Sequence, residues 1–176
     1  ILAGEGVHAH KRRQIIDSAG LLDLWRDEEK VERWAKHRLY VWAQTTETLY
    51  TRLNELTTAN FAWALGHTSA ANRYTPTLTR EPDPEIWISA EIPVEQVGGA
   101  LEGEVVESGS NLTVWQCSGD SPLYHAGPVD SPHNHQHPIV SRYRAYVEAY
   151  HRGGRSEEVA TRLRENLDLS ESRTSQ

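Results

Sequence analysis

Three alternating histidines in the C-terminal third of the chain have the spacing that points most directly to chemistry. His133, His135 and His137 are separated by Asn134 and Gln136. Alternate side chains of an extended chain point to one side, and neutral imidazole is a common ligand of zinc, nickel, copper and iron. The three histidines are therefore a candidate metal site, and a fourth, open position would suit catalysis.

Adventitious metal binding is a second interpretation of these histidines. The three residues fall in a predicted loop over residues 118–138, and histidines in loops are often exposed. His125, with a carboxylate from Asp120 or Asp130, would complete a functional ligand set. A histidine-loop metal-binding protein is accordingly one alternative function for the chain.

Two further groups of reactive residues have a simpler structural interpretation. Cys117 has the chemistry of a nucleophile, with His125 as its base, but a single cysteine in a strand is more often a small buried hydrophobe. Three tyrosines alternate with arginines on a helix predicted over residues 140–151, and we interpret them as its docking face: Tyr143, Tyr146 and Tyr150.

The composition excludes several classes of protein. With 25 acidic and 18 basic residues, the net charge is -7, which argues against a general nucleic-acid binder. One cysteine excludes an intrachain disulfide and a cysteine-rich zinc site. No apolar run approaches the roughly 18 residues of a membrane span, and no signal-type segment opens the sequence. We therefore expect no membrane partner and, by default, a cytoplasmic location.

Hydrophobic periodicity predicts helices in the N-terminal half around one short strand. The predicted helices cover residues 11–19, 28–37 and 46–66, the strand covers residues 39–43, and a short strand over residues 1–7 precedes them. A loop follows over residues 67–85, where three prolines disfavour regular structure. Loops of this length are often functional or disordered.

The second half of the sequence changes to a β pattern. Strands are predicted over residues 86–92, 102–107 and 112–117, and a turn or short helix over residues 94–100. Two helices, over residues 140–151 and 156–167, close the pattern. The whole predicts a single α+β domain over residues 1–169, with an antiparallel β segment over about 86–117 and a disordered tail over residues 170–176.

Three stretches of the N-terminal half share an order of features with one known superfamily. His8 and His10 precede a segment that ends in Gly20–Leu21, the strand over residues 39–43 contains a tyrosine, and the strand over residues 86–92 is followed by Glu104. This order resembles ADP-ribosyltransferase-like domains, over roughly residues 7–107. The resemblance implies NAD as the substrate.

The resemblance also implies how NAD is held. His8 or His10 would bond the ribose of the adenosine half, and Tyr40 with Tyr50 would enclose the nicotinamide ring. Aromatic faces suit a flat cationic ring.

Catalysis, on the same resemblance, falls to Glu104 in preference to Glu107, together with Tyr40. A fixed carboxylate beside the ribose stabilises the positive charge that develops as nicotinamide leaves. The resemblance thus predicts an NAD-cleaving enzyme that transfers ADP-ribose to an acceptor of unknown identity or to water.

A non-catalytic subunit that binds a protein partner is the other main alternative. Six tryptophans and seven tyrosines suit an interface as well as a core. Such a protein would expose apolar faces on residues 46–65 and 140–167 and would have no convergent polar pocket. An enzyme would instead gather an early histidine, Tyr40 and Glu104 around one cleft.

Overall fold

The computed structural model describes residues 17–29, 34–116, 119, 121–124, 127–128 and 137–167. Several expectations lie outside these residues: the strand over residues 1–7, most of the helix over residues 11–19, the tail over 170–176, and the residues His8, His10, Cys117, Asp120, His125, Asp130, His133 and His135.

The described residues alternate between helices and strands and confirm the α+β class. The helices are α1 (Ser18–Glu28), α2 (Thr46–Arg52), α3 (Asn54–Thr58), α4 (His67–Tyr74), α5 (Val94–Ala100), α6 (Arg142–Arg152) and α7 (Arg155–Glu165). The strands are β1 (Ala35–Val41), β2 (Trp63–Leu65), β3 (Glu85–Ile88), β4 (Gly103–Val105), β5 (Leu112–Gln116), β6 (Gly127–Pro128) and β7 (Pro138–Ile139). None of these helices is long and apolar enough to cross a bilayer.

The described strands form one seven-stranded mixed sheet in the order β4-β1-β5-β3-β2-β7-β6. β3 runs parallel to β5, and β2 parallel to β7, whereas the other neighbours are antiparallel. The strands predicted over residues 102–107 and 112–117 are present as β4 and β5, but they do not pair with each other, because β1 lies between them. β1 buries Leu39 and Val41 completely, whereas β4 is mostly exposed, so β4 takes the edge.

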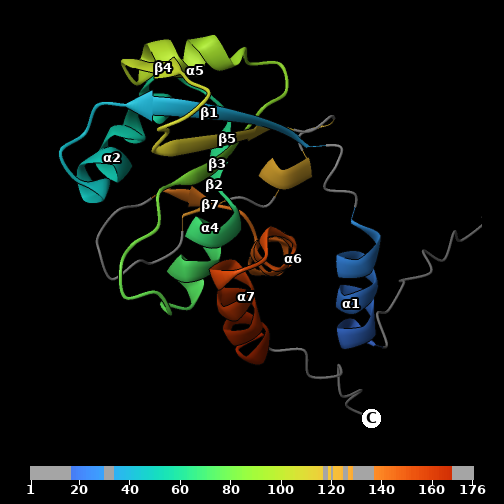
Figure 1. Cartoon of the computed structure of the whole chain (residues 1–176). Coiled ribbons are helices and arrows are strands. Elements are labelled where there is room, and N and C mark those ends of the chain that lie inside the picture. The colour runs from blue at the N-terminus through green and yellow to red at the C-terminus, as the bar shows by residue number, and fades with distance from the viewer. Residues whose placement is uncertain are drawn as a thin grey trace, which may run out of the picture.

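Alternation along the strands gives the sheet two different faces. The first face is apolar: Leu39, Val114 and Ile86 are fully buried there, and Gly98 of α5 approaches Leu39. The second face holds Trp115 and the side chains of its strand partners, and α4, α6 and α7 cover part of it. In Figure 1 these three helices form one group near β2 and β7, while α5 lies beside β4 at the other end of the sheet.

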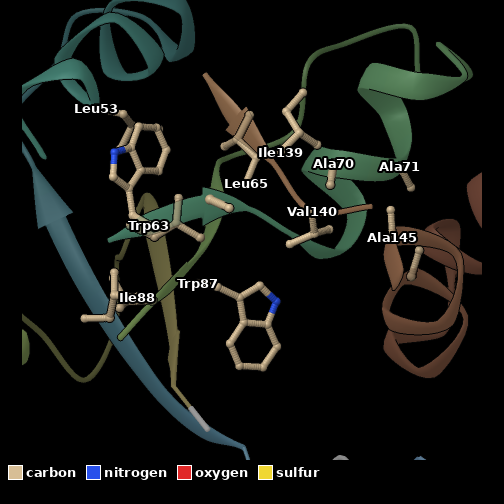
Figure 2. Close-up of a cluster of buried hydrophobic side chains, with 14 of the residues drawn as sticks. Leu53, Trp63, Leu65, Ala70, Ala71, Trp87, Ile88, Ile139, Val140 and Ala145 are labelled. Carbon is tan, nitrogen blue, oxygen red and sulfur yellow. The ribbon is translucent and has the colours of Figure 1, made fainter. Parts of the chain in front are cut away.

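Two tryptophans mark the two faces. Trp63 of β2 and Trp87 of β3 are both buried, and Figure 2 shows them on opposite sides of the strands. The Trp63 indole donates a hydrogen bond to Thr57 at the end of α3. Trp87 instead lies on the side of α4 and α6, whose small residues Ala70 and Ala145 allow the helices to approach closely.

Three predicted segments differ from the structure. The helix predicted over residues 28–37 is wrong, because α1 ends at Glu28 and residues 35–37 already belong to β1. The helix over residues 46–66 breaks after Arg52 and gives way to β2. The loop over residues 67–85 contains α4, whose buried face consists of small and polar residues and so lacks the large apolar periodicity that identifies a helix.

Candidate functional site

His67, the first residue of α4, combines several features that are costly to stability. Its backbone has a φ of 50°, a left-handed conformation that is uncommon for a residue with a side chain. Its side chain is 1% exposed. The preceding residue, Gly66, packs closely against the Trp87 ring. A Cβ at this position would lie 2.5 Å from that ring, so only glycine fits here without a shift. Strained and buried polar residues of this kind are concentrated at functional sites.

The imidazole ring of His67 is enclosed by indoles. It stacks on Trp115 with ring centroids 4.3 Å apart and on Trp87 at 5.4 Å, and Trp34 meets it edge-on at 5.4 Å. Neither ring nitrogen has a hydrogen-bond partner among the described residues. A buried polar group left unpaired costs about 1–3 kcal/mol, so this arrangement calls for a functional explanation.

A small cavity adjoins this ring. Its volume is about 170 Å³, and the residues that line it are Trp34, His67, Trp115, Glu148, His151 and Arg152. An apolar cavity of about 150 Å³ is enough to accept benzene. The tryptophan cavity, as we call it below, is therefore large enough for one aromatic ring.

Two charged side chains at the tryptophan cavity, Glu148 and Arg144, are paired and buried, whereas Arg152 is paired but exposed. Glu148 accepts hydrogen bonds from Arg144 Nε at 2.7 Å and from the backbone N–H of His67 at 2.8 Å. Burial nevertheless raises the pKa of Glu148 above its ordinary value. Burial lowers the pKa of His67 well below its usual range, and Arg152 adds to this effect, so His67 is neutral.

A second, larger cavity lies beside the first. Its volume is about 550 Å³, and its wall includes Arg80, Arg152 and Arg155. Arg152 lines both cavities and pairs with Glu85 at 2.8 Å. We call this space the arginine cavity. The same wall carries the carboxyl groups of Glu81, Asp83 and Glu85. Guanidinium groups recognise phosphate through paired hydrogen bonds, so the arginines of this wall are candidate phosphate-binding groups.

The arginine cavity leads to the end of β1. Asn111 lines the cavity and bonds both the backbone N–H and the carbonyl of Val41. The neighbouring residue, Tyr40, is 42% exposed and lies directly opposite Glu104 of β4. The register places Tyr40, with Lys36 and its partner Trp115, on the second face of the sheet.

Of the residues predicted to bind and cleave NAD, the structure brings two together. Tyr40 and Glu104 are cross-strand neighbours on an exposed part of the sheet, although neither lines the two cavities. Tyr50 does not join them. It is 1% exposed, its hydroxyl donates to the carbonyl of Pro82, and burial raises its pKa.

The predicted metal ligands give no cluster in the part of the chain that the structure describes. His137 is 1% exposed, and its Nε2 lies 2.8 Å from the carbonyl oxygen of Tyr50, which accepts a hydrogen bond. Among the described residues there is no group of three histidine, cysteine or acidic side chains that could hold a metal.

Sequence reasoning missed the tryptophan cavity. His67 falls in the segment predicted to be a loop, and the prediction for the helix over residues 140–151 concerns only its docking tyrosines. One signal was available: Arg144, Glu148 and Arg152 follow each other at four-residue spacing on the face of a helix that also buries apolar residues. Charges of both signs on a buried face indicate a paired internal network.

Comparison with known proteins assigns neither a family nor a function to the chain. No protein-family model matches the sequence, and no curated protein matches it either. The resemblance to ADP-ribosyltransferase-like domains stays a prediction.

Proposed function

We propose that the protein cleaves NAD and that the dinucleotide lies along the second face of the sheet. One half would lie in the tryptophan cavity, the diphosphate in the arginine cavity, and the nicotinamide ribose beside Tyr40 and Glu104. The single observation that supports this proposal best is the order of these three features along one face.

The dimensions of the face are compatible with an extended dinucleotide. β1 has seven residues, which corresponds to about 20 Å at roughly 3.3 Å per residue. Trp34 precedes its first residue and lines the tryptophan cavity, whereas Tyr40 lies near its end. The arginine cavity borders β5, the strand next to β1, through Leu112 and Thr113, so a substrate along β1 would pass beside this cavity between its two rings.

Arginines outnumber the carboxylates that have no ion pair in the wall of the arginine cavity. Glu85 pairs with Arg152, and Glu81 pairs with Arg73. Among the described residues this leaves Asp83 against Arg80 and Arg155, which form no ion pair and would be available to a diphosphate. The backbone beside them turns through Gly153 and Gly154 into the N-terminus of α7, where helix amides favour an anion. These groups would hold the phosphates without taking part in bond cleavage.

The chemistry would take place at the exposed end. The bond between C1′ of the ribose and the ring nitrogen breaks, and nicotinamide leaves with the bonding electron pair. Glu104 stabilises the positive charge that develops on the ribose, and Tyr40 provides a face for the departing ring. Water or an acceptor then adds to C1′ and loses a proton.

The assembly alternative has less support. It requires an apolar face on residues 46–65, but the large apolar residues there are buried: Leu49, Leu53 and Leu56 are at most 1% exposed. On α6, Tyr143 and Tyr150 are about 40% exposed, whereas the apolar residues Val159, Ala160 and Leu163 of α7 are buried. A polar, arginine-lined cavity favours a small-molecule ligand.

The proposal is tested by incubating the protein with NAD and measuring released nicotinamide by chromatography. We expect release by the wild type and a loss of about 10²-fold or more in Glu104→Gln, since a removed transition-state contact has effects of this size. Glu95→Gln, an exposed change on α5, is the matched control and should keep full activity. No release by the wild type contradicts the proposal, and full activity of Glu104→Gln contradicts the role of Glu104.

A further inference from the structure

His67 has unused hydrogen-bonding capacity, and it forms part of the wall of a cavity of the size of one ring. A neutral imidazole has one N–H donor and one bare nitrogen acceptor. Both stay unpaired among the described residues, although the backbone N–H of the same residue is bonded to Glu148. A ligand with a polar edge would pair with this imidazole and remove the cost of the buried, unpaired nitrogens.

Positive groups already surround the indole faces of the tryptophan cavity. Lys36 Nζ lies 5.2 Å from the ring centre of Trp115, and the guanidinium of Arg152 lies 5.9 Å from the same ring. The guanidinium of Arg144 lies 5.8 Å from the ring centre of Trp34. A cationic ligand ring would bind over the faces of these indoles, but the side chains of Lys36, Arg144 and Arg152 already occupy positions beside them.

The charges around the cavity do not leave a negative surplus. Arg144 pairs with Glu148, and Arg152 pairs with Glu85. Glu29 also lies 4.0 Å from Arg144, and Lys36 forms no ion pair with a described residue, so the three cations and three carboxylates balance. No carboxylate of this set is left over to pair with a pyridinium ring, whereas an uncharged ring needs no such partner.

We infer that the tryptophan cavity binds an uncharged heteroaromatic base and that His67 recognises the polar edge of that base by hydrogen bonding. Adenine, with ring-nitrogen acceptors and an amino donor, has the required chemistry. The inference rests on the proposed function in one respect: it assigns the adenosine half of NAD to this cavity, and the cationic nicotinamide to the exposed end. His67 is thereby a residue that determines specificity and not one that breaks a bond.

The experiment measures binding and no turnover, so it stands apart from the test of NAD cleavage. Adenosine 5′-monophosphate is compared with ribose 5-phosphate, which has the phosphate but no ring. Nicotinamide mononucleotide is compared with its reduced form, because these two differ in the charge of the ring. Calorimetry gives the Kd values for the wild type and for His67→Phe, which keeps an aromatic ring but has no nitrogen.

For the wild type we expect adenosine monophosphate to bind at least tenfold more tightly than ribose 5-phosphate. The reduced mononucleotide should bind more tightly than the oxidised one. His67→Phe should weaken the binding of adenosine monophosphate about tenfold and leave that of ribose 5-phosphate unchanged. Equal affinities for the adenine nucleotide and the ring-free phosphate, or tighter binding of the oxidised mononucleotide, overturn the inference.

A second measurement keeps the inference testable if His67→Phe does not fold. In the wild-type protein, ¹⁵N resonances of the His67 imidazole report its hydrogen bonds. Adenosine monophosphate should shift them, and ribose 5-phosphate should not. Imidazole resonances that stay unchanged when adenosine monophosphate binds show that His67 does not contact the base.

Discussion

The second face of the sheet has two ends with opposite physical character. At the covered end, which comprises His67, Trp87, Trp115 and Glu148, helices α4 and α6 exclude water from charged and aromatic groups. At the open edge, which comprises Tyr40 and Glu104, the same face is exposed, and Trp42, directly after β1, is 62% exposed. One face of one sheet thus provides a region covered by helices and a surface open to solvent.

The difference between the covered end and the open edge indicates which step, ligand binding or bond cleavage, suits each of them. In the covered end, low dielectric strengthens interactions between charges and shifts pKa values, upward for Glu148 and downward for His67. We expect such an environment to discriminate between charged and neutral rings. The open edge gives a leaving group and an acceptor free access, which a transferase needs. Selective binding and bond cleavage are therefore expected at different ends.

The largest effect should come from comparing one glutamate of each end. Glu148→Ala leaves Arg144 and the His67 backbone N–H without their partner in the protein interior, and we expect a loss of about 3–5 kcal/mol in the free energy of unfolding. Glu104→Ala on the exposed strand should change it by less than about 0.5 kcal/mol. Urea unfolding at pH 7.5 measures both, and equal losses would show that the two ends are not different.

A pair of glycines gives the next largest contrast. A Cβ at Gly66 would lie 2.5 Å from Trp87 and 3.0 Å from Glu148, so Gly66→Ala should destabilise the protein by about 1–3 kcal/mol. Gly99 in α5 has nothing within 4 Å of the added atom. Gly99→Ala should therefore stabilise by roughly 0.5–1 kcal/mol, because alanine is the better helix former. Thermal unfolding of the two variants checks the signs, and a neutral Gly66→Ala would contradict the close packing of the covered end.

The pH dependence of stability should change with His67. The pKa of His67 is lowered in the folded state, whereas an unfolded histidine titrates near about 6.5. Between pH 7.5 and 5.5 the unfolded chain therefore takes up a proton that the folded protein does not, and stability falls as pH falls. This contribution is about 1.4 kcal/mol over that range and should be missing in His67→Phe.

Subtracting the pH dependence of His67→Phe from that of the wild type cancels the contributions of the other titrating groups. Glu148, whose pKa is raised in the folded state, acts in the opposite direction, because the folded protein binds its proton more readily than the unfolded chain. It is present in both proteins, so it cancels in the difference. Identical pH slopes for the wild type and His67→Phe would mean that His67 is accessible to protons in the folded protein.

The smallest effect is expected for an ion pair near the open edge. Arg52 and Glu102 lie 2.6 Å apart, but the Glu102 side chain is 82% exposed. Glu102→Gln should cost no more than about 0.5 kcal/mol, and added salt should remove the difference. Urea titrations at low and high ionic strength measure it, and a loss above 1 kcal/mol would place this ion pair in the same energetic class as those of the covered end.

The sequence predicted the parts of the fold that depend on local pattern. The α+β class, the strand through Leu39 and Val41, and the two C-terminal helices follow from apolar periodicity and end signals. The insertion of β1 between β4 and β5 does not, because strand order depends on which segments bury most apolar surface in three dimensions. The same holds for α4, whose packing uses small residues.

The candidate site was predictable to a different extent at its two ends. Tyr40 and Glu104 were assigned to one site by resemblance, and the register makes them direct neighbours. The covered end was not predicted, since His67, Trp115 and Glu148 come from three distant segments and only tertiary packing brings them together. No local pattern encodes such a contact.

The central claim is that one NAD molecule uses both ends of the face, and steady-state kinetics with NAD as substrate tests it most directly. Arg152→Gln, at the junction of the two cavities, should raise KM at least tenfold with a small change in kcat, because it acts in binding. Glu104→Gln should lower kcat with little change in KM. If both variants change the same parameter, or if the wild type releases no nicotinamide, the two ends do not serve one substrate and the account is wrong.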